Sequence, residues 1–226
     1  MQKSLVALIR CDGYEFDRVF EAIKKGVNLL GGIEGFIKKG ENILIKPNLL
    51  AGREPDRAVT THPAIFEAVV KLLLDNEINV TYGDSPGIDK PSMASQKSGL
   101  TEVAKKYNIK MGDFNSSKSV VFQDGVFGNK FEIASGVLDS DGIVNISKMK
   151  SHQLTRITGA VKNQFGCVYG FNKASYHVTH PNATHFCKML VDLNRFIKSR
   201  LYIMDGIVAM EGNGPASGEP VKMNCI

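Results

Sequence analysis

Short apolar runs alternate along the sequence with longer segments in which apolar residues recur every three or four positions. The runs occupy residues 4–10, 42–46, 79–82, 142–146 and 201–204. The helix-like segments are 16–30, 64–76, a stretch from 93, 101–107 and 184–198. Buried parallel strands are continuous apolar runs, and helices join them. The order therefore predicts an α/β fold, with a mostly parallel sheet and helices on both of its faces.

The stretch 110–133 departs from this alternation. It carries short β-like pieces, and we expect it to form a small antiparallel, β-rich insertion. No repeat or low-complexity linker divides the chain, which predicts a single α/β domain over residues 1–226. The chain stops at Ile226 directly after a predicted loop, so we expect the native protein to be longer at its C-terminus.

Composition excludes several classes of protein. The longest apolar run, Leu5–Ile9, is about five residues, whereas a membrane-spanning helix needs about 20. The net charge is +5 without a run of five basic residues, which argues against nucleic-acid binding. The four cysteines form no C-x-x-C pair, which argues against a zinc ribbon or a 4Fe–4S cysteine run. Sparse cysteine and the lack of a signal peptide predict a cytoplasmic protein.

Polar clusters follow four of the predicted strands. They are Lys46-Pro47-Asn48, Gly83-Asp84-Ser85-Pro86-Gly87, Ser147-Lys148-Met149-Lys150-Ser151-His152 and Met204-Asp205-Gly206. Ligands of open α/β sheets bind beyond the carboxyl ends of the strands. We therefore expect Lys46, Lys148 and Lys150, together with Lys162, to form one positive pocket for a carboxylate or a phosphate. The alternative is that these lysines are solvated loop residues.

The segment 158–166 has a glycine near its start and carries Lys162 and Asn163, which predicts a helix start suited to an anion. His152 lies ten residues before Lys162. Nearby lysines should lower the pKa of its imidazole, and a neutral imidazole is a general base or a metal ligand. The alternative for His152 is a hydrogen-bonded structural role.

Three further features leave alternatives open. His62 precedes Pro63 at a helix start, where it either caps the helix or contacts substrate. Asp84 and Asp205 lie at strand ends, and each is a candidate for a base or a metal ligand. The residues His177, His180, His185 and Cys187 fall within eleven positions. Their spacing matches no established metal-ligand pattern, so metal binding there stays open.

The strand-end motifs resemble the family described as domain of unknown function 362. The matching segments are 45–49, 60–63, 83–87, 148–152, 158–166, 204–207 and 211–215. Many members of that family carry a ferredoxin-like module with two 4Fe–4S cysteine runs. This chain has no such run, so the resemblance implies no 4Fe–4S cluster here, but it suggests a ferredoxin-type domain or protein as a partner.

A more distant resemblance is to the lactate racemase family. Its members have a strand, a histidine and then a glycine-rich stretch with a lysine, similar to the order from His152 to Lys162. In that family the two residues help to hold a nickel-pincer nucleotide cofactor. The resemblance therefore implies a nickel or nucleotide cofactor at His152 and Lys162, although the glycine-rich stretch is thinner here.

These observations predict an enzyme that acts on a small carboxylate or phosphate, with redox-linked chemistry as one option. The predicted catalytic residues are His152, Lys162 and Asp84. The predicted ligand-binding residues are Lys46, Asn48, His62, Ser85, Lys148, Lys150, Asn163 and Asp205. Two alternatives are a racemase-like enzyme with a nickel or nucleotide cofactor, and a non-catalytic module that docks a ferredoxin-type partner through its basic face.

Overall fold

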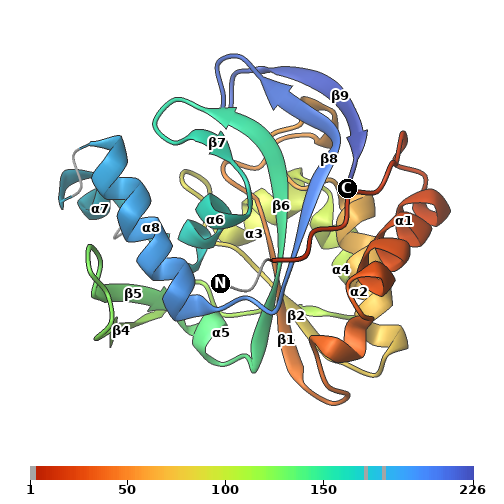
Figure 1. The fold of residues 1–226 in the computed structure, drawn as a ribbon, viewed down its shortest axis with the longest axis horizontal. Coiled ribbons are helices and arrows are strands. Elements are labelled where there is room, and N and C mark those ends of the chain that lie inside the picture. Colours follow the sequence, from red (N-terminus) through yellow and green to blue (C-terminus); the bar gives the residue numbers. More distant parts are fainter. Residues whose placement is uncertain (1–3, 171–172, 180–181) are drawn as a thin grey trace.

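The structure is a computed structural model that describes residues 4–170, 173–179 and 182–226, except for the side chains of Ala174 and His177. A seven-stranded sheet runs through its centre in the order β3-β2-β1-β6-β8-β9, with β7 paired to β6 (Figure 1). Its strands are β1 Asn42–Pro47, β2 Asn79–Tyr82, β3 Lys110–Met111, β6 Gly142–His152, β7 Arg156–Thr158, β8 Leu201–Glu211 and β9 Glu219–Cys225. Strands β3, β2, β1, β6 and β8 are parallel, whereas β7 and β9 pair antiparallel to their neighbours.

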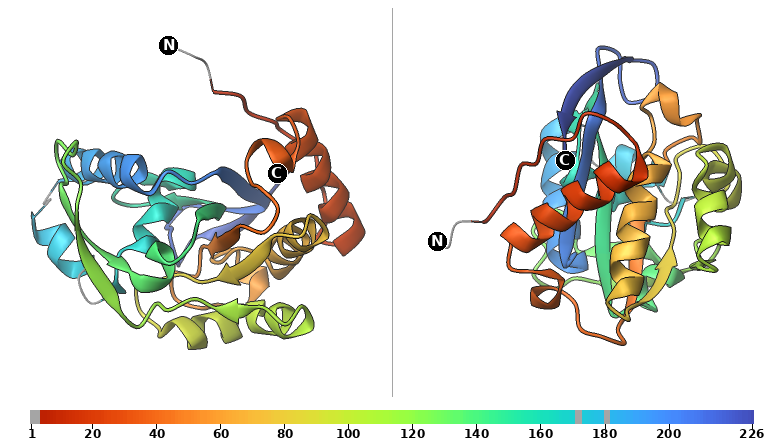
Figure 2. Two further views of the ribbon diagram at one scale, coloured as in Figure 1. Left: turned by 90° about the horizontal axis from the view of Figure 1, so that it is seen from below. Right: turned by 90° about the vertical axis from the view of Figure 1, so that its right-hand side faces the viewer.

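Helices cover both faces of this sheet (Figure 2). One face packs against α1 Phe16–Leu29, α2 Pro63–Asp75, α3 Pro91–Lys97 and α4 Leu100–Lys106. The other face carries α5 Ser135–Leu138, α6 Ala160–Asn163, α7 Lys173–Thr179 and α8 Ala183–Ile197. A separate antiparallel pair, β4 Ser117–Val121 and β5 Lys130–Ala134, packs beside α8. The predicted α/β fold is therefore confirmed.

The two faces of the sheet have separate hydrophobic cores because successive residues of a strand point to opposite sides. Ile43 and Ile45 of β1 belong to the core under α1 and α2, whereas Leu44 belongs to the core under α8. Strand β6 alternates in the same way, with Val144 and Ile146 on the α1 side. This alternation decides on which face each strand-end lysine lies.

Local sequence sets the ends of the helices next to the sheet. Helix α1 ends at Gly31 and Gly32, whose φ angles of 109° and 86° are left-handed, and Gly32 N–H donates to the Val27 carbonyl. Helix α2 begins with Pro63 in its first turn, and the His62 side chain accepts a hydrogen bond from Ala64 N–H as its N-cap. The capping role expected for His62 is confirmed.

The prediction of a buried strand at residues 4–10 is wrong. Leu5, Val6 and Leu8 are 77%, 87% and 77% exposed. The segment lies extended beside the end of β9, where Ile9 and Ile226 exchange two backbone hydrogen bonds of 2.9 Å. The loop expected before Ile226 is the strand β9 instead. Its sequence carries Glu, Lys and Asn because much of this edge strand is exposed, which hides the strand from a search for apolar runs.

Two other boundaries differ from expectation. Residues 110–111 form β3 and pair with β2 in the main sheet, so the antiparallel pair begins only at Ser117. Strands β6 and β8 continue for six and seven residues beyond their predicted ends at Ile146 and Met204. These continuations carry Lys148 and Lys150 on β6 and Asp205 on β8. No helix in the described part of the chain combines the length and the hydrophobicity that crossing a bilayer requires.

Candidate functional site

The carboxyl edge of the sheet holds three fully buried lysines. Lys46, Lys148 and Lys150 are 0%, 0% and 1% exposed. The interpretation as solvated loop lysines is therefore wrong for these three. A buried ammonium is costly unless it is paired and hydrogen-bonded, so the partners of each lysine define the site.

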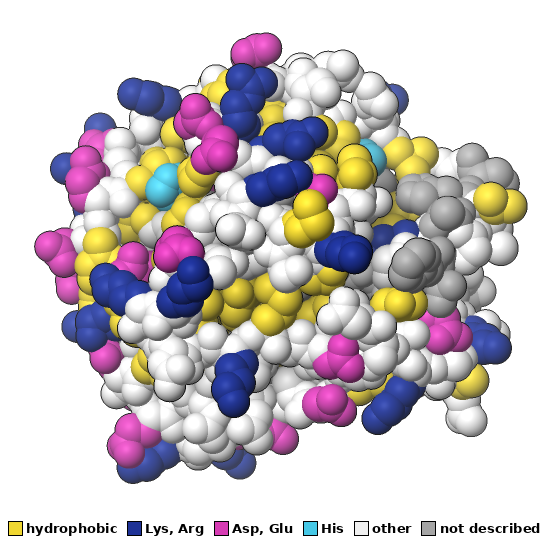
Figure 3. Space-filling view, turned by 180° about the vertical axis from the view of Figure 1, so that it is seen from behind, with side chains coloured by type: hydrophobic (Ala, Val, Ile, Leu, Met, Phe, Trp, Pro, Cys, Tyr) yellow, Lys and Arg dark blue, Asp and Glu magenta, His cyan; other side chains and the backbone are white. Residues whose placement is uncertain are grey.

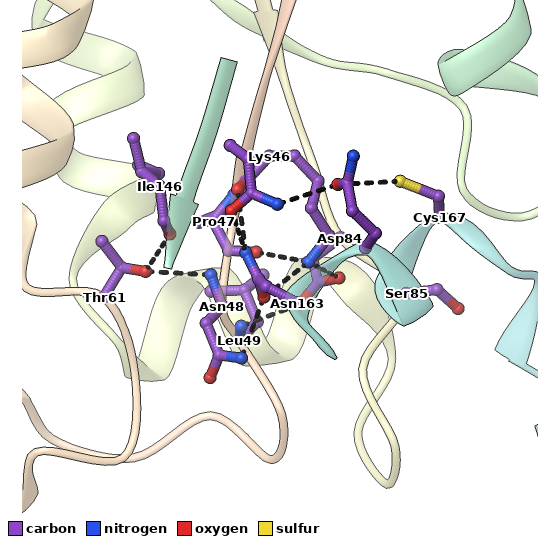
Figure 4. Close-up of polar contacts among 12 residues, drawn as sticks. Lys46, Pro47, Asn48, Leu49, Thr61, Asp84, Ser85, Ile146, Asn163 and Cys167 are labelled. Carbon is purple, nitrogen blue, oxygen red and sulfur yellow. Dashed lines mark hydrogen bonds and ion pairs between the residues drawn. The ribbon is translucent and has the colours of Figure 1, made fainter. Parts of the chain in front are cut away.

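Lys46 lies on the α6 and α8 side of the sheet, since it follows Leu44 at a spacing of two on β1. Its Nζ lies 2.8 Å from Asp84 Oδ1 and donates to Asn163 Oδ1 and the Pro47 carbonyl, each at 2.8 Å. Asp84 Oδ2 in turn accepts from Leu49 N–H at 2.8 Å. Figure 4 shows Lys46, Asn48 and Asn163 pointing toward one another. The predicted residues Lys46, Asp84 and Asn163 thus form one connected group.

Lys150 links this group, through Asn48, to the backbone at Val59. Its Nζ donates to Asn48 Oδ1 at 2.9 Å and to the Val59 carbonyl at 2.5 Å, and Asn48 Nδ2 donates to Asn163 Oδ1 at 2.9 Å. Both acceptors of Lys150 are neutral oxygens. Burial, followed by the charge of Lys162, holds the pKa of Lys150 well below its usual value.

Lys148 lies on the opposite, α1 side of the sheet, in phase with Ile146. Its Nζ donates to Asp205 Oδ2 at 2.8 Å and to the Tyr14 hydroxyl at 3.0 Å. Tyr14 donates to Asp205 Oδ1 at 2.8 Å, and its hydroxyl also accepts from Val208 N–H at 3.1 Å. The single pocket predicted for the lysines is therefore two groups on opposite faces of the sheet, and the hydrogen bonds of Lys150 and Asn48 belong to the Lys46 group.

Two further lysines lie near Asp84, and neither is paired with a carboxylate in the described part of the chain. Lys162 of α6 is partly buried, and among the described residues its ammonium makes no hydrogen bond or ion pair. Lys173, at the start of α7, donates to the Ser85 carbonyl and lies 5.7 Å from the centre of the Phe165 ring. Burial is the largest cause that lowers the pKa of each lysine to about 8.

A cleft of about 560 Å³ opens on the Lys148 side. Its lining residues are Tyr14, Glu54, Pro55, Asp56, His62 and Val208. The rings of Tyr14 and His62 stack at 3.6 Å with an interplanar angle of 11°. His62 Nδ1 accepts from Ala64 N–H at 3.1 Å, so the proton of the neutral imidazole is on Nε2. Burial lowers the pKa of His62 to about 4, which keeps the ring neutral at neutral pH.

His62 should make the protein less stable in acid. Its pKa is about 4 in the folded state and about 6.5 in the unfolded chain. The unfolded chain therefore binds more protons between these values, and the free energy of unfolding falls as the pH falls through this window. The variant His62→Asn keeps a capping acceptor. Between pH 7 and pH 4.5 its free energy of unfolding should fall by about 2 kcal/mol less than that of the wild type. Urea unfolding at both pH values measures this difference, and equal losses in the two proteins would contradict it.

The remaining predicted residues are Ser85 and His152. Ser85 is buried, and its N–H donates to the Gly166 carbonyl at 2.9 Å. The hydrogen bonds described for His152 are local, since Nδ1 accepts from Leu154 N–H and Thr155 N–H at 3.1 and 3.4 Å. None of these bonds joins His152 to Lys162. A catalytic role for His152 stays a prediction.

The sequence also suggests metal and partner sites. His180 and the side chain of His177 lie outside the described residues, so metal binding by the histidine and cysteine cluster stays a prediction. Among the side chains that are described, no group of three or more His, Cys, Asp or Glu is placed to hold a metal ion. The nickel or nucleotide cofactor that the resemblance implies at His152 and Lys162 stays a prediction. The ferredoxin-type partner also stays a prediction.

Three contributors to this edge were not predicted. Tyr14 comes from the loop before α1 and reaches Asp205, 191 positions away in the sequence. Lys173 and Gly166 both contact the loop after β2. The only sequence signal for Gly166 was its place at the end of the segment 158–166, and nothing local distinguished Tyr14 or Lys173 from surface residues.

Comparison with known proteins adds a family and a fold. The family model described as "Domain of unknown function (DUF362)" matches residues 43–226. The "Thylakoid-associated protein sll1697" of Synechocystis is 33% identical over 222 residues, which cover 98% of this chain and 68% of that protein. The name of this relative places it at the thylakoid, so the cytoplasmic location expected for this chain stays a prediction.

Two solved structures are similar in fold. The lactate racemase apoprotein of Thermoanaerobacterium thermosaccharolyticum has a TM-score of 0.57 and 12% identity, over 98% of this chain and 53% of that one. A Thermotoga maritima protein solved by a structural genomics consortium has a TM-score of 0.49 and 14% identity, over 94% and 55%. The chain thus spans about half the length of each. The first likeness agrees with the α/β fold found here, and at this identity it carries no statement about activity.

Proposed function

Because the chain belongs to the DUF362 family, whose description gives no activity, we propose from the site that it is an enzyme acting on a small carboxylate or phosphate. The anion binds on the Asp84 side of the sheet edge, next to Lys162. Lys46 and Asn163 shape this site, and Lys162 holds or releases a proton at the bound anion.

The unpaired ammonium of Lys162 is the observation that carries this proposal. It is partly buried, lies within the electrostatic reach of Lys46 and Asp84, and has no hydrogen-bond or ion-pair partner in the described part of the chain. A partly buried cation without a counter-charge costs free energy, which a bound anion would offset. A lysine whose pKa is about 8 also exchanges protons readily near neutral pH.

Other features of the edge support an anion. Ser147 lies two residues beyond Asn145 on β6, on the face of Asn163, and its buried hydroxyl has no hydrogen-bond partner among the described residues. Buried polar groups in folded proteins are nearly always paired, so this hydroxyl is available to a ligand. In the surface view, Lys and Arg side chains lie at the upper centre of this face and also elsewhere on it, among acidic side chains (Figure 3).

In this proposal Asp84 is a positioning residue and not the proton carrier expected from the sequence. Both of its oxygens are engaged, Oδ1 with Lys46 and Oδ2 with Leu49 N–H. Its carboxylate fixes the ammonium of Lys46 and lowers the positive charge of the site by one.

Calorimetric titration with phosphate and with acetate tests the proposal. We expect Lys162→Gln to weaken the binding of the tighter anion about tenfold, which is the usual contribution of one charged hydrogen bond. The same variant should unfold at an equal or higher urea concentration than the wild type, because it removes an unpaired charge. Lys105→Gln is the matched control, since Lys105 is exposed on α4 and pairs with Glu102. Unchanged affinity in Lys162→Gln, or a wild type that binds neither anion, would overturn the proposal.

A further inference from the structure

We propose that the ligand of this site is a dianion, a phosphate or a dicarboxylate, held between Lys162 and Lys173. This inference rests on the proposed function. It adds Lys173 of α7 as a second anion-binding residue and narrows the class of ligand by its charge.

The balance of charge around Asp84 carries the inference. Three ammonium groups, those of Lys46, Lys162 and Lys173, act on this one carboxylate. Lys46 is paired with Asp84 at 2.8 Å. The other two have no carboxylate partner in the described part of the chain, so two positive charges lack a counter-charge. A monoanion would neutralise only one of them.

Lys173 is placed as a ligand-binding residue. It is partly buried, and its ammonium lies over the Phe165 ring and donates to the Ser85 carbonyl, which is a neutral acceptor. Ser85 N–H is bonded to the Gly166 carbonyl at 2.9 Å, which ties this loop to the turn that follows α6. Lys173 of α7 therefore contacts the loop after β2, and Lys162 of α6 interacts electrostatically with Asp84 of the same loop.

Lys150 does not add to the two positive charges that lack a counter-charge. It is fully buried and hydrogen-bonded to two neutral oxygens, Asn48 Oδ1 and the Val59 carbonyl. Its surroundings disfavour its charged form. Two cysteines interact electrostatically with these lysines, namely Cys187 of α8 with Lys162 and Cys167 with Lys173. Burial raises the pKa of Cys167 to about 12, so this thiol carries no charge.

A dianion should bind with uptake of protons. The pKa values of Lys162 and Lys173 are about 8, because burial and the charge of Lys46 disfavour the ammonium. A bound dianion favours both ammonium groups and raises both values. At pH 8 the two lysines together then take up about one proton on binding. At pH 6 both are already protonated, and uptake should vanish.

The test is calorimetry in two buffers of different ionisation enthalpy, at pH 6 and pH 8. Sulfate is the main probe because it stays a dianion at both values, malonate is the dicarboxylate, and nitrate and acetate are the monoanions. We expect sulfate or malonate to bind the wild type at least about tenfold more tightly than the matching monoanion. The ratio of sulfate to malonate affinity distinguishes a phosphate-like ligand from a dicarboxylate.

The variants distinguish a failure of this inference from a failure of the proposed function. Lys173→Gln should weaken the dianion about tenfold, leave monoanion binding within about threefold, and reduce proton uptake at pH 8 by about half. Lys105→Gln should change neither. The dianion inference would be overturned if monoanions bound as tightly as dianions, or if Lys173→Gln bound the dianion as tightly as the wild type does. Either result would leave the anion site at Lys162 in place. If the wild type binds no anion at all, the proposed function fails as well.

Discussion

Replacing Gly166 with alanine is expected to destabilise the protein by about 3–5 kcal/mol, the usual cost of disrupting a buried ion pair. A Cβ atom at this position would overlap Asp84 Oδ1 and would lie 2.5 Å from Lys46 Nζ and 2.7 Å from Lys46 Cε. The ion pair packs directly on the α carbon of residue 166. Its partners cannot simply move aside, since Asp84 is also held by Leu49 N–H and Lys46 by Asn163.

Urea unfolding of Gly166→Ala measures this cost, and Gly35→Ala is the matched control. Gly35 has no atom within 4 Å of an added Cβ and has no left-handed φ, so its replacement should change the free energy of unfolding by less than about 1 kcal/mol. A Gly166→Ala protein as stable as this control would show that the Lys46–Asp84 pair does not require the glycine. The same variant should also bind sulfate more weakly, because Lys46 and Asp84 shape the surroundings of Lys162.

The sequence predicts the scaffold of this site better than its geometry. Strand β2 lies at the predicted residues 79–82, and α1 and α8 lie within about one residue of their predicted ends. These elements are defined by local periodicity, which is readable without knowledge of the partner strand. The polar clusters after the strands were also identified, because the carboxyl edge of a parallel sheet follows from strand order alone.

The face on which each lysine lies required the structure. Lys46 and Lys148 follow similar apolar runs, yet Lys46 is in phase with Leu44 and Lys148 with Ile146, and these belong to different cores. A shift of one residue in a strand moves every side chain to the other face. The single predicted pocket is therefore two groups, although the predicted edge of the sheet is correct for Lys46, Lys148 and Lys150.

The burial of these lysines was also beyond a local reading of the sequence. A lysine is mostly exposed unless a partner compensates its charge. The partners come from distant segments: Asn163 lies 117 positions from Lys46, and Tyr14 lies 134 positions from Lys148. Without these contacts a solvated loop lysine was a reasonable interpretation, and only tertiary structure distinguishes the two cases.

Asp205→Asn is expected to destabilise the protein by about 3–5 kcal/mol, because it leaves the buried Lys148 ammonium without its counter-charge. Asp205 is 0% exposed and accepts from three groups, namely Lys148 Nζ, the Tyr14 hydroxyl and the backbone N–H of His62. An asparagine of the same shape has one acceptor oxygen, and its NH₂ group would face a donor. The loss in free energy of unfolding should therefore exceed that for an exposed pair. Lys71 and Asp75 form such a pair, and Asp75→Asn should cost less than about 1 kcal/mol.

A double variant separates the ion pair from the space that it fills. Lys148→Met with Asp205→Leu removes both charges and keeps apolar volume, and such replacements of buried pairs are often neutral in stability. We expect the double variant to be more stable than Asp205→Asn, since no charge is left unpaired, although Tyr14 loses its acceptor. Unfolding free energies of the double variant and its two single variants form a cycle, and the interaction energy should be at least about 1 kcal/mol. If the two single losses instead add to the double, Lys148 and Asp205 contribute independently, and the pair does not organise this side of the sheet edge.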